Sequence, residues 1–260
     1  MGVEPFDSAS LMLPVYQQVA EQLQMKLGCT VQLNITTNYT AEVEAMRAKT
    51  LEVGEFGPLG YIFAKQLANA QPVATFADSS GTPLTYYASI VTWSGSGITS
   101  LDQVKGKKFA YSDPASTSGH LYPAFALKKM GIDPDTGIQA IYAGSHTASF
   151  VAIKNHKVDA GELNSDRIAA ATKTGDYAAA NFPTLWKSDP IPEDPITVRG
   201  DLSDAFKQKF TQALLSLNLS IIPDPKGELI GPKLVAQTDA PYTQVRDLVG
   251  TLGIDVNHIG

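Results

Sequence analysis

Cysteine is almost absent from this sequence, in which Cys29 is the single example among 260 residues. One cysteine excludes an intramolecular disulfide and every metal site that needs several thiolates. Cys29 follows Gly28 in a predicted turn between a helix and a strand, with no histidine close by along the chain. A lone cysteine of this kind usually behaves as a small apolar side chain, so we expect Cys29 to be buried.

Excess positive charge and long apolar runs are missing as well. The formal net charge is −6, which argues against nucleic acid or an anionic membrane surface as a partner, because neither attracts an acidic protein. No segment approaches the roughly 20 consecutive apolar residues that cross a membrane. An anionic ligand would therefore have to be held by local hydrogen-bond donors.

Catalytic signatures are not found either. The sequence has no G-x-S-x-G elbow, no Walker loop and no G-x-G-x-x-G after a predicted strand. The four histidines lack the spacing of a metal site; they are His120, His146, His156 and His258. We therefore expect a binding protein and not an enzyme, with no cofactor and no bound metal.

Helical and extended patterns alternate from the start of the chain. Val15, Val19, Leu23 and Leu27 recur every four residues and Gly28 ends the pattern, which is typical of an amphipathic helix. The alternation continues and predicts layered α/β sheets with helices on both faces, which bind ligands beyond the carboxyl ends of their strands. The expected strands lie at 31–35, 53–56, 72–77, 86–93, 107–111, 138–142, 157–160, 185–187 and 196–199, and two of the expected helices lie at 100–105 and 166–174.

Two changes of composition indicate that the chain passes between two lobes. The loose run Ser94–Gly97 follows a β-prone segment, and a new α/β round begins after it. The proline-rich run Pro190–Pro195 precedes a strand that would carry the chain back. We predict two doubly wound α/β lobes joined by a two-strand hinge, with the first at 1–90 plus 196–260, the second at 91–195, and a ligand cleft between them.

Three consecutive hydroxyl side chains, Ser116, Thr117 and Ser118, lie between a predicted strand and a predicted helix, and Gly119 follows them. The first turn of a helix leaves about four backbone N–H groups unpaired and carries roughly half a positive charge. Hydroxyl donors at such a place complete a binding site for an oxyanion. The alternative is that Ser116 or Thr117 only caps the helix, which is the more usual role of these residue types.

Further donors occur where other predicted elements begin. His146 lies at a helix start between Ser145 and Thr147, and Tyr39 and Tyr87 offer longer hydroxyl arms. Donors without an activated nucleophile indicate binding and not catalysis. The alternative for His146 is a purely structural hydrogen bond.

The order of these motifs resembles that of the phosphonate-binding protein family, the periplasmic solute-binding components of phosphonate and phosphite ABC importers. The resemblance rests on Asp113–Gly119, followed at a distance by Gly144–Ser149 and then by Val158–Ala160. Further matches follow in the expected order, namely Phe56–Tyr61, Tyr87–Val91 and Asp194-Pro195. The resemblance covers nearly the whole chain.

The resemblance implies a two-lobed periplasmic-binding-protein fold that captures phosphite or a small phosphonate such as methylphosphonate and delivers it to a membrane permease. Tyr87 would close over the ligand, and Tyr39 would reach in from the first lobe. The residues that would hold the phosphorus oxyanion are Ser116, Thr117, Ser118 and His146. The family also implies a monomer outside the cytoplasm. Since Met1–Phe6 already resembles the lead-in to a first strand, we expect any secretory signal to have been removed.

Two acidic positions also follow from the resemblance. In family members that take aminoalkyl phosphonates, carboxylates contact the amine of the ligand, and the matching positions here are Asp166 and Asp194. A carboxylate repels a dianion but accepts a hydrogen bond from a P–OH group or pairs with an ammonium, so these residues would select a protonated or zwitterionic ligand. Alternatively, Asp166 caps its helix or pairs with Arg167, and Asp194 steadies the hinge near Arg199.

Other functions remain open on the sequence. The same fold could serve as the extracellular sensor domain of a signalling receptor, or could bind another small anion such as a sulfonate or a thiamine precursor. A hydrolase or transferase with His146 as the base is a third alternative, which the absence of an activated nucleophile disfavours. The sequence does not choose between phosphite, methylphosphonate and aminoethylphosphonate.

Overall fold

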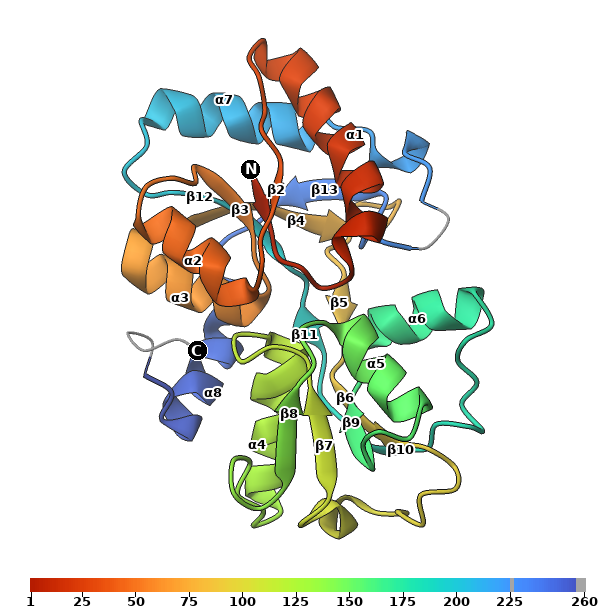
Figure 1. Ribbon diagram of the computed structural model, residues 1–260. Coiled ribbons are helices and arrows are strands. Elements are labelled where there is room, and N and C mark those ends of the chain that lie inside the picture. The colour runs from red at the N-terminus through yellow and green to blue at the C-terminus, as the bar shows by residue number, and fades with distance from the viewer. Residues whose placement is uncertain (225–226, 256–260) are drawn as a thin grey trace. The chain divides into compact units, whose positions relative to one another are not determined.

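The computed structural model describes residues 1–224 and 227–255, and the chain divides into two compact α/β units (Figure 1). Unit 1 contains Met1–Thr85 and Pro192–Asp247, and unit 2 contains Tyr86–Ile191 and Leu248–Ile254. The sequence predicts boundaries after residues 90 and 195 and a tail that belongs wholly to the first lobe. The structure instead divides the chain after Thr85 and Ile191 and assigns Leu248–Ile254 to unit 2. His258 lies outside the described residues.

Unit 1 is built on a six-stranded sheet with the strand order β13-β4-β12-β3-β1-β2. β1 pairs in parallel with β2 and β3, whereas β12 runs antiparallel to β3 and β4. β12 and β13 follow unit 2 in the sequence, so the returning chain completes this sheet. The bounds are β1 Gly2–Val3, β2 Asn34–Ile35, β3 Val53–Glu55, β4 Gln71–Ala77, β12 Pro195–Val198 and β13 Lys233–Ala236.

The helices of unit 1 pack their apolar stripes against this sheet. Val15, Val19 and Leu23 of the first helix are buried together with Phe210 and Leu214 of a helix from the returning chain, as the four-residue spacing predicts. Figure 1 shows these two helices, α1 and α7, at one face of the sheet and α2 and α3 at the other. The bounds are α1 Ala9–Leu27, α2 Tyr39–Arg47, α3 Pro58–Ala68 and α7 Asp204–Leu215, with 3₁₀ turns η3 Leu219–Ile221 and η4 Ala240–Tyr242. Helix α8 Thr243–Leu252 begins in unit 1 and belongs to unit 2 from Leu248 on.

Unit 2 has a five-stranded sheet with the order β10-β6-β9-β7-β8. β7 is parallel to β8 and β9, and β6 is antiparallel to β9 and β10. Because β7, β8 and β9 are parallel, the loops that follow them leave from the same edge of the sheet. The bounds are β6 Ser89–Thr92, β7 Lys108–Tyr111, β8 Gln139–Tyr142, β9 Ala160–Glu162 and β10 Thr184–Lys187.

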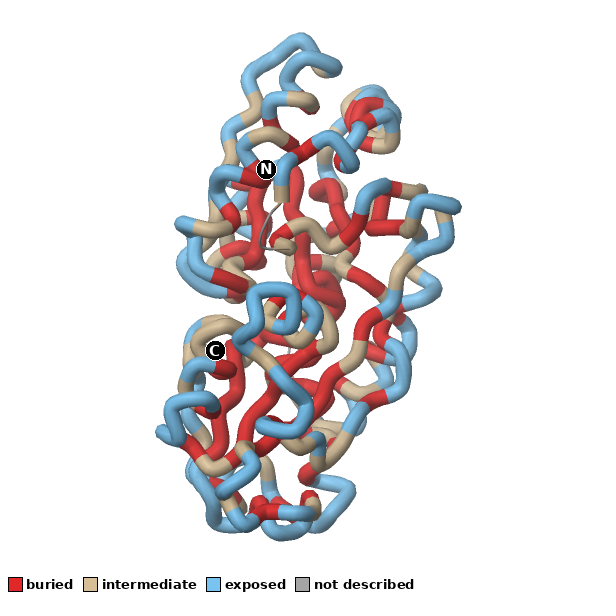
Figure 2. The backbone as a smooth tube through the Cα atoms, turned by 90° about the vertical axis from the view of Figure 1, so that its right-hand side faces the viewer, coloured by how far each residue is buried: buried red, intermediate tan, exposed pale blue. Residues whose placement is uncertain are grey.

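The helices of unit 2 include two short irregular turns. The segment expected as a helix at 100–105 is a 3₁₀ turn, and the strand expected at 157–160 begins only at Ala160, after His156 adopts a left-handed conformation (φ 54°). Buried apolar side chains form two clusters in this unit, and Figure 2 colours the buried stretches of the backbone red. The bounds are η1 Leu101–Val104, the π-helical turn η2 Thr117–Leu121, α4 Tyr122–Lys129, α5 His146–Lys154 and α6 Ser165–Lys173.

The chain crosses between the units in two short strands that pair with each other. β5 Thr85–Tyr86 and β11 Ile191–Pro192 form a separate two-stranded sheet. The long strand expected at 86–93 is therefore interrupted, because Tyr87 and Ala88 separate β5 from β6.

Cys29 is exposed, so its predicted burial is wrong. Gly28 ends α1 in a left-handed conformation (φ 69°) and turns the chain away from the core, which leaves the next side chain at the surface. Across residues 1–224 and 227–255, no helix combines the length and the apolar character that a membrane crossing requires.

Candidate functional site

The three hydroxyl side chains are buried where unit 2 turns from strand β7 into helix. Ser116, Thr117 and Ser118 are 2%, 1% and 1% exposed. Ser116 is the N-cap of η2, because its Oγ accepts a hydrogen bond from the backbone N–H of Gly119 at 3.1 Å. The capping role of Ser116 is thus confirmed, and it does not exclude a ligand role, because accepting this bond leaves the hydroxyl proton available to donate.

Gly119 is required by the close packing of this turn. A Cβ atom at position 119 would collide with the side chains of Ser112 and Ser116. The backbone of Gly119 also accepts a hydrogen bond from the Ser112 amide at 3.2 Å, which folds the loop back onto the end of β7. Only glycine can therefore bring the hydroxyl residues this close to the strand.

His146 is buried beside this turn and links it to strand β9. It is the first residue of α5, after the N-cap Ser145, whose Oγ accepts from the Ala148 amide at 3.1 Å. Its Nδ1 lies 2.9 Å from Glu162 Oε2 and its Nε2 lies 3.5 Å from Ser116 Oγ. Since a carboxylate only accepts, Nδ1 carries the proton and Nε2 faces the hydroxyl turn.

Asn164 connects the start of α6 with the same turn. Its Oδ1 accepts the Arg167 amide at 2.8 Å and caps the helix, while its Nδ2 donates to Ser118 Oγ at 3.4 Å. The predicted alternative in which Asp166 caps this helix is therefore wrong. Because Asn164 occupies a lone pair of Ser118, the Ser118 hydroxyl proton remains available for another acceptor.

Asp166 and Tyr87 lie next to this cluster in the first turn of α6 and in the strand region before β6. Burial raises the pKa of the Asp166 carboxyl to about 6, and the nearby charges of His146 and Arg167 oppose that increase. The backbone of Tyr87 is bound in both directions to Ser165, with N···O distances of 3.0 Å. The Tyr87 ring is half-buried, and an exposed lysine, Lys187, places its Nζ 3.7 Å from the ring centroid.

Unit 1 carries the other two predicted site residues. Tyr39 is the first residue of α2, after the cap Asn38, and is 3% exposed. Asp194 is half-buried just before β12. Arg199, the residue near which Asp194 was expected to steady the hinge, donates to Asp201 and to the Leu51 carbonyl at 2.6 and 2.8 Å.

Unit 1 also buries acidic side chains near these positions. Glu4 Oε2 accepts the Gly57 amide at 2.7 Å, at the start of α3, and Glu55 Oε1 accepts from the Tyr16 hydroxyl at 2.5 Å. Burial raises the pKa of Glu55 to about 7. Burial, and next the charge of Glu55, hold the pKa of Glu42 well above its usual range. Among the described residues, no group of histidine, cysteine and acidic side chains is arranged to hold a metal ion.

Glu162 and Asn164 are functional candidates that the sequence analysis missed. Both come directly after Val158–Ala160, the last of the three matched motifs, and both lie at the carboxyl end of a parallel strand. That position was the available signal, because ligands bind beyond the carboxyl ends of such strands.

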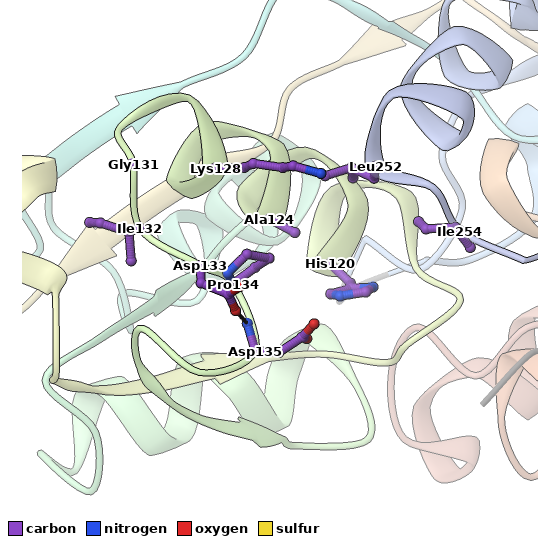
Figure 3. Close-up of a pocket in the computed structure, with 10 residues that line it drawn as sticks. All are labelled: His120, Ala124, Lys128, Gly131, Ile132, Asp133, Pro134, Asp135, Leu252 and Ile254. Atoms are coloured by element: carbon purple, nitrogen blue, oxygen red, sulfur yellow. Dashed lines mark hydrogen bonds between the residues drawn. The ribbon is translucent and has the colours of Figure 1, made fainter.

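A separate pocket of about 470 Å³ lies on unit 2 and includes His120 of the η2 turn in its lining (Figure 3). None of the predicted site residues lines it. The His120 ring and the Asp135 carboxylate point into it in Figure 3, and His120 Nδ1 lies 2.8 Å from the Pro114 carbonyl. Burial lowers the pKa of His120. The η2 turn thus directs His120 to this pocket and its hydroxyl residues to His146 and Asn164.

Sequence comparison relates the whole arrangement to known proteins. Residues 1–230 match the family described as ABC transporter, phosphonate, periplasmic substrate-binding protein. The chain belongs to this family. The resemblance stated from the Ser116–Gly119 and Gly144–Ser149 motifs is thereby confirmed. This family consists of substrate-binding transport proteins.

Three related proteins are named for different anions, namely phosphate, phosphonates and phosphite. The chain is 30% identical over 198 residues to the phosphate-import protein PhnD of Mycolicibacterium smegmatis, covering 72% of this chain and 61% of the relative. It is 26% identical over 233 residues to the phosphonates-binding periplasmic protein of Escherichia coli, covering 88% and 68%. A probable phosphite-binding protein of Prochlorococcus marinus is 25% identical over 226 residues, covering 85% and 76%. The match to the first relative thus spans less than two thirds of that protein.

Solved structures confirm the predicted fold class. A binding protein component of a phosphonate transporter from Pseudomonas aeruginosa has a TM-score of 0.84 at 23% identity and covers 95% of this chain and 83% of its own. PhnD1 of Prochlorococcus marinus in complex with methylphosphonate also has a TM-score of 0.84, at 20% identity, with 97% of both chains covered. These neighbours are two-lobed periplasmic binding proteins, and at these identities they show the fold alone.

Proposed function

We propose that this chain is the solute-binding component of an ABC importer. It captures a reduced phosphorus oxyanion, phosphite or a small phosphonate such as methylphosphonate, outside the cytoplasm and delivers it as a monomer to the membrane permease. Family membership supports the transport role. The observation that carries the ligand class is the buried cluster of Ser116, Ser118 and His146 at the start of a helix, since donors at a helix N-terminus favour an anion.

The hydrogen bonds behind these donors determine what they can offer a ligand. Ser116 accepts from Gly119 and Ser118 accepts from Asn164, so each hydroxyl proton can be donated forward. Thr117 is buried between them and lies in the first turn of the helix. An oxyanion that binds here loses its hydrogen bonds to water, and charge-assisted hydrogen bonds from these three hydroxyl groups can replace them.

The remaining predicted residues complete the proposal. We assign Tyr87, whose backbone is bound to the start of α6, to a position over the ligand. Tyr39 and Asp194, which belong to unit 1, are proposed to contact the ligand as well. Asp166 supports selection of a protonated or zwitterionic ligand, because a buried carboxylate repels a dianion but accepts a hydrogen bond from a P–OH or pairs with an ammonium.

A ligand panel tests this function directly. Purified protein is heated with phosphite, phosphate, methylphosphonate, aminoethylphosphonate and an alkyl sulfonate, and unfolding is followed by a fluorescent dye. A ligand present at a hundred times its Kd adds about 2.7 kcal/mol to the free energy of unfolding. We expect a clear shift with phosphite or a small phosphonate and none with the sulfonate. The proposal would be refuted if the sulfonate alone shifted the unfolding temperature, or if none of the phosphorus compounds shifted it.

A further inference from the structure

Glu162 is a buried carboxylate of which one oxygen alone is hydrogen-bonded among the described residues. Oε2 accepts from His146 Nδ1 at 2.9 Å, while Oε1 is buried without a partner, and the residue is 0% exposed. Leaving part of a buried carboxylate unsatisfied is costly. A neutral amide or an apolar residue would fill this place on β9 with less cost, so packing alone does not account for Glu162.

We propose that Glu162 is a positioning residue that couples oxyanion binding to the uptake of a proton by His146. The inference rests on the proposed function, because it describes how the same site grips its ligand. Glu162 keeps the proton on Nδ1, so that Nε2 is the nitrogen that gains or loses a proton. Nε2 faces the hydroxyl turn, 3.5 Å from Ser116 Oγ.

The two states of Nε2 interact with an oxyanion in opposite ways. Without a proton, its lone pair repels an ionised ligand oxygen; with a proton, it becomes a charge-assisted donor. An oxyanion at the turn therefore binds the imidazolium form more tightly, and by linkage it drives proton uptake. The Glu162 carboxylate stabilises that imidazolium through Nδ1, which lies at hydrogen-bond distance.

Three further groups lie near the His146 imidazole and influence how readily it holds a second proton. Asp166, from the first turn of α6, places a second carboxylate near the imidazole, and Arg167 offsets part of that charge. Ser116, from η2, is neutral and can donate to Nε2 or accept from it. Asp166 can also take up a proton when an anion arrives, so the experiment must separate it from His146.

Calorimetry with matched variants provides the test. Methylphosphonate and phosphite are titrated into wild type, Glu162→Gln and Asp166→Asn between pH 6 and 8, in buffers of different ionisation enthalpy, which reports the protons taken up. Glutamine keeps an oxygen that accepts from Nδ1, so position is retained while charge is lost. The ionisation of the free ligand is the same in all three titrations, so a difference in proton uptake reports the bound state, and the His146 measurement below assigns it to the imidazole.

We expect wild type and Asp166→Asn to take up as much as one proton more than Glu162→Gln on binding. Wild-type affinity should fall by as much as tenfold per pH unit relative to Glu162→Gln as the pH rises. Equal proton uptake and parallel pH profiles in wild type and Glu162→Gln would overturn the inference. Absence of binding to wild type by every phosphorus oxyanion would overturn the proposed function itself.

A second measurement keeps the inference testable if Glu162→Gln does not fold. Nitrogen chemical shifts of the His146 imidazole in wild type, assigned with His146→Gln, distinguish imidazole from imidazolium. Conversion to imidazolium on addition of methylphosphonate at pH 7.5 is the expected result. An imidazole that keeps the same protonation state with and without ligand would overturn the coupling even where binding is tight.

Discussion

Two hydroxyls of the candidate site, those of Ser116 and Ser118, each accept a hydrogen bond from another residue. Asn164 donates to Ser118, and the Gly119 amide donates to Ser116, so both oxygens enter the site with a lone pair already used. Serine hydroxyls rotate easily and can accept or donate. These contacts bias both hydroxyls toward donation, which is what an oxyanion requires.

Removing a single donor should weaken binding and leave the fold intact. We expect Ser118→Ala and His146→Ala each to raise the Kd for methylphosphonate or phosphite more than tenfold, because a hydrogen bond to a charged group contributes about 1.5–3 kcal/mol. Ser118→Ala should leave the unfolding midpoint nearly unchanged. Calorimetry gives the Kd and circular dichroism the midpoint.

An exposed serine of the same unit provides the control for that experiment. Ser94 lies in the loose turn after β6 and its side chain is exposed. Ser94→Ala should bind like wild type. Equal affinity in Ser118→Ala and Ser94→Ala would remove Ser118 from the binding set.

At the scale of single elements, the η2 turn is more constrained than a usual helix start. It is a π-helical turn of five residues that runs directly into α4, and such turns are rare and frequent at functional sites. The turn places Ser118 within hydrogen-bond distance of Asn164 and places His120 in the lining of the pocket of Figure 3. The position of the hydroxyl residues therefore depends on Gly119, which keeps the turn close to Ser112.

Gly119→Ala should damage binding more than any single hydroxyl deletion. The new methyl group meets the Ser112 and Ser116 side chains and forces the turn away from β7. We expect a loss of measurable ligand binding and a lower unfolding midpoint. The free energy of unfolding should fall by an amount typical of overpacking, about 1–3 kcal/mol. Thermal unfolding with and without ligand measures both effects.

Gly250→Ala is the matched substitution without a steric clash. Gly250 lies in α8, and a Cβ atom placed there meets no atom within 4 Å. Alanine in an exposed helix position should raise the unfolding free energy by about 0.5–1 kcal/mol and leave binding unchanged. If Gly119→Ala behaves like Gly250→Ala, the close packing of the η2 turn has no role in the site.

On the scale of the whole molecule, the buried acids of unit 1 make stability depend on pH. The pKa of Glu55 is raised by burial from 4.5 to about 7. The folded protein therefore holds this proton over a range in which the unfolded chain has released it. The associated stability is fully present below pH 4.5 and is lost as the pH rises through 7, by roughly 3 kcal/mol.

Glu55→Gln should flatten this dependence. Glutamine retains an oxygen that accepts from the Tyr16 hydroxyl and does not ionise. Urea unfolding at pH 5 and pH 8 should show that the wild type loses more stability than the variant across this interval. A wild type and a variant with identical losses would show that Glu55 is ionised in the folded protein at both pH values.

The sequence by itself determined the α/β alternation, the end of the first helix at Gly28, and the hydroxyl turn, because periodicity and capping act over a few residues. The same locality made Ser116, Thr117, Ser118 and His146 recognisable as donors at element starts. It failed at Cys29, where exposure depends on the direction in which the chain leaves the helix.

Only the tertiary structure decided which residues form hydrogen bonds with those donors. Glu162 and Asn164 reach His146 and Ser118 because β9 lies beside β7 in the sheet, a pairing between segments about 50 residues apart (Phe109 with Ala160). No local rule sets that register; it follows from burying the apolar faces of both strands together. Burial is also what raises the pKa of Glu55 and Asp166, and burial is a property of the packed molecule and not of the residue.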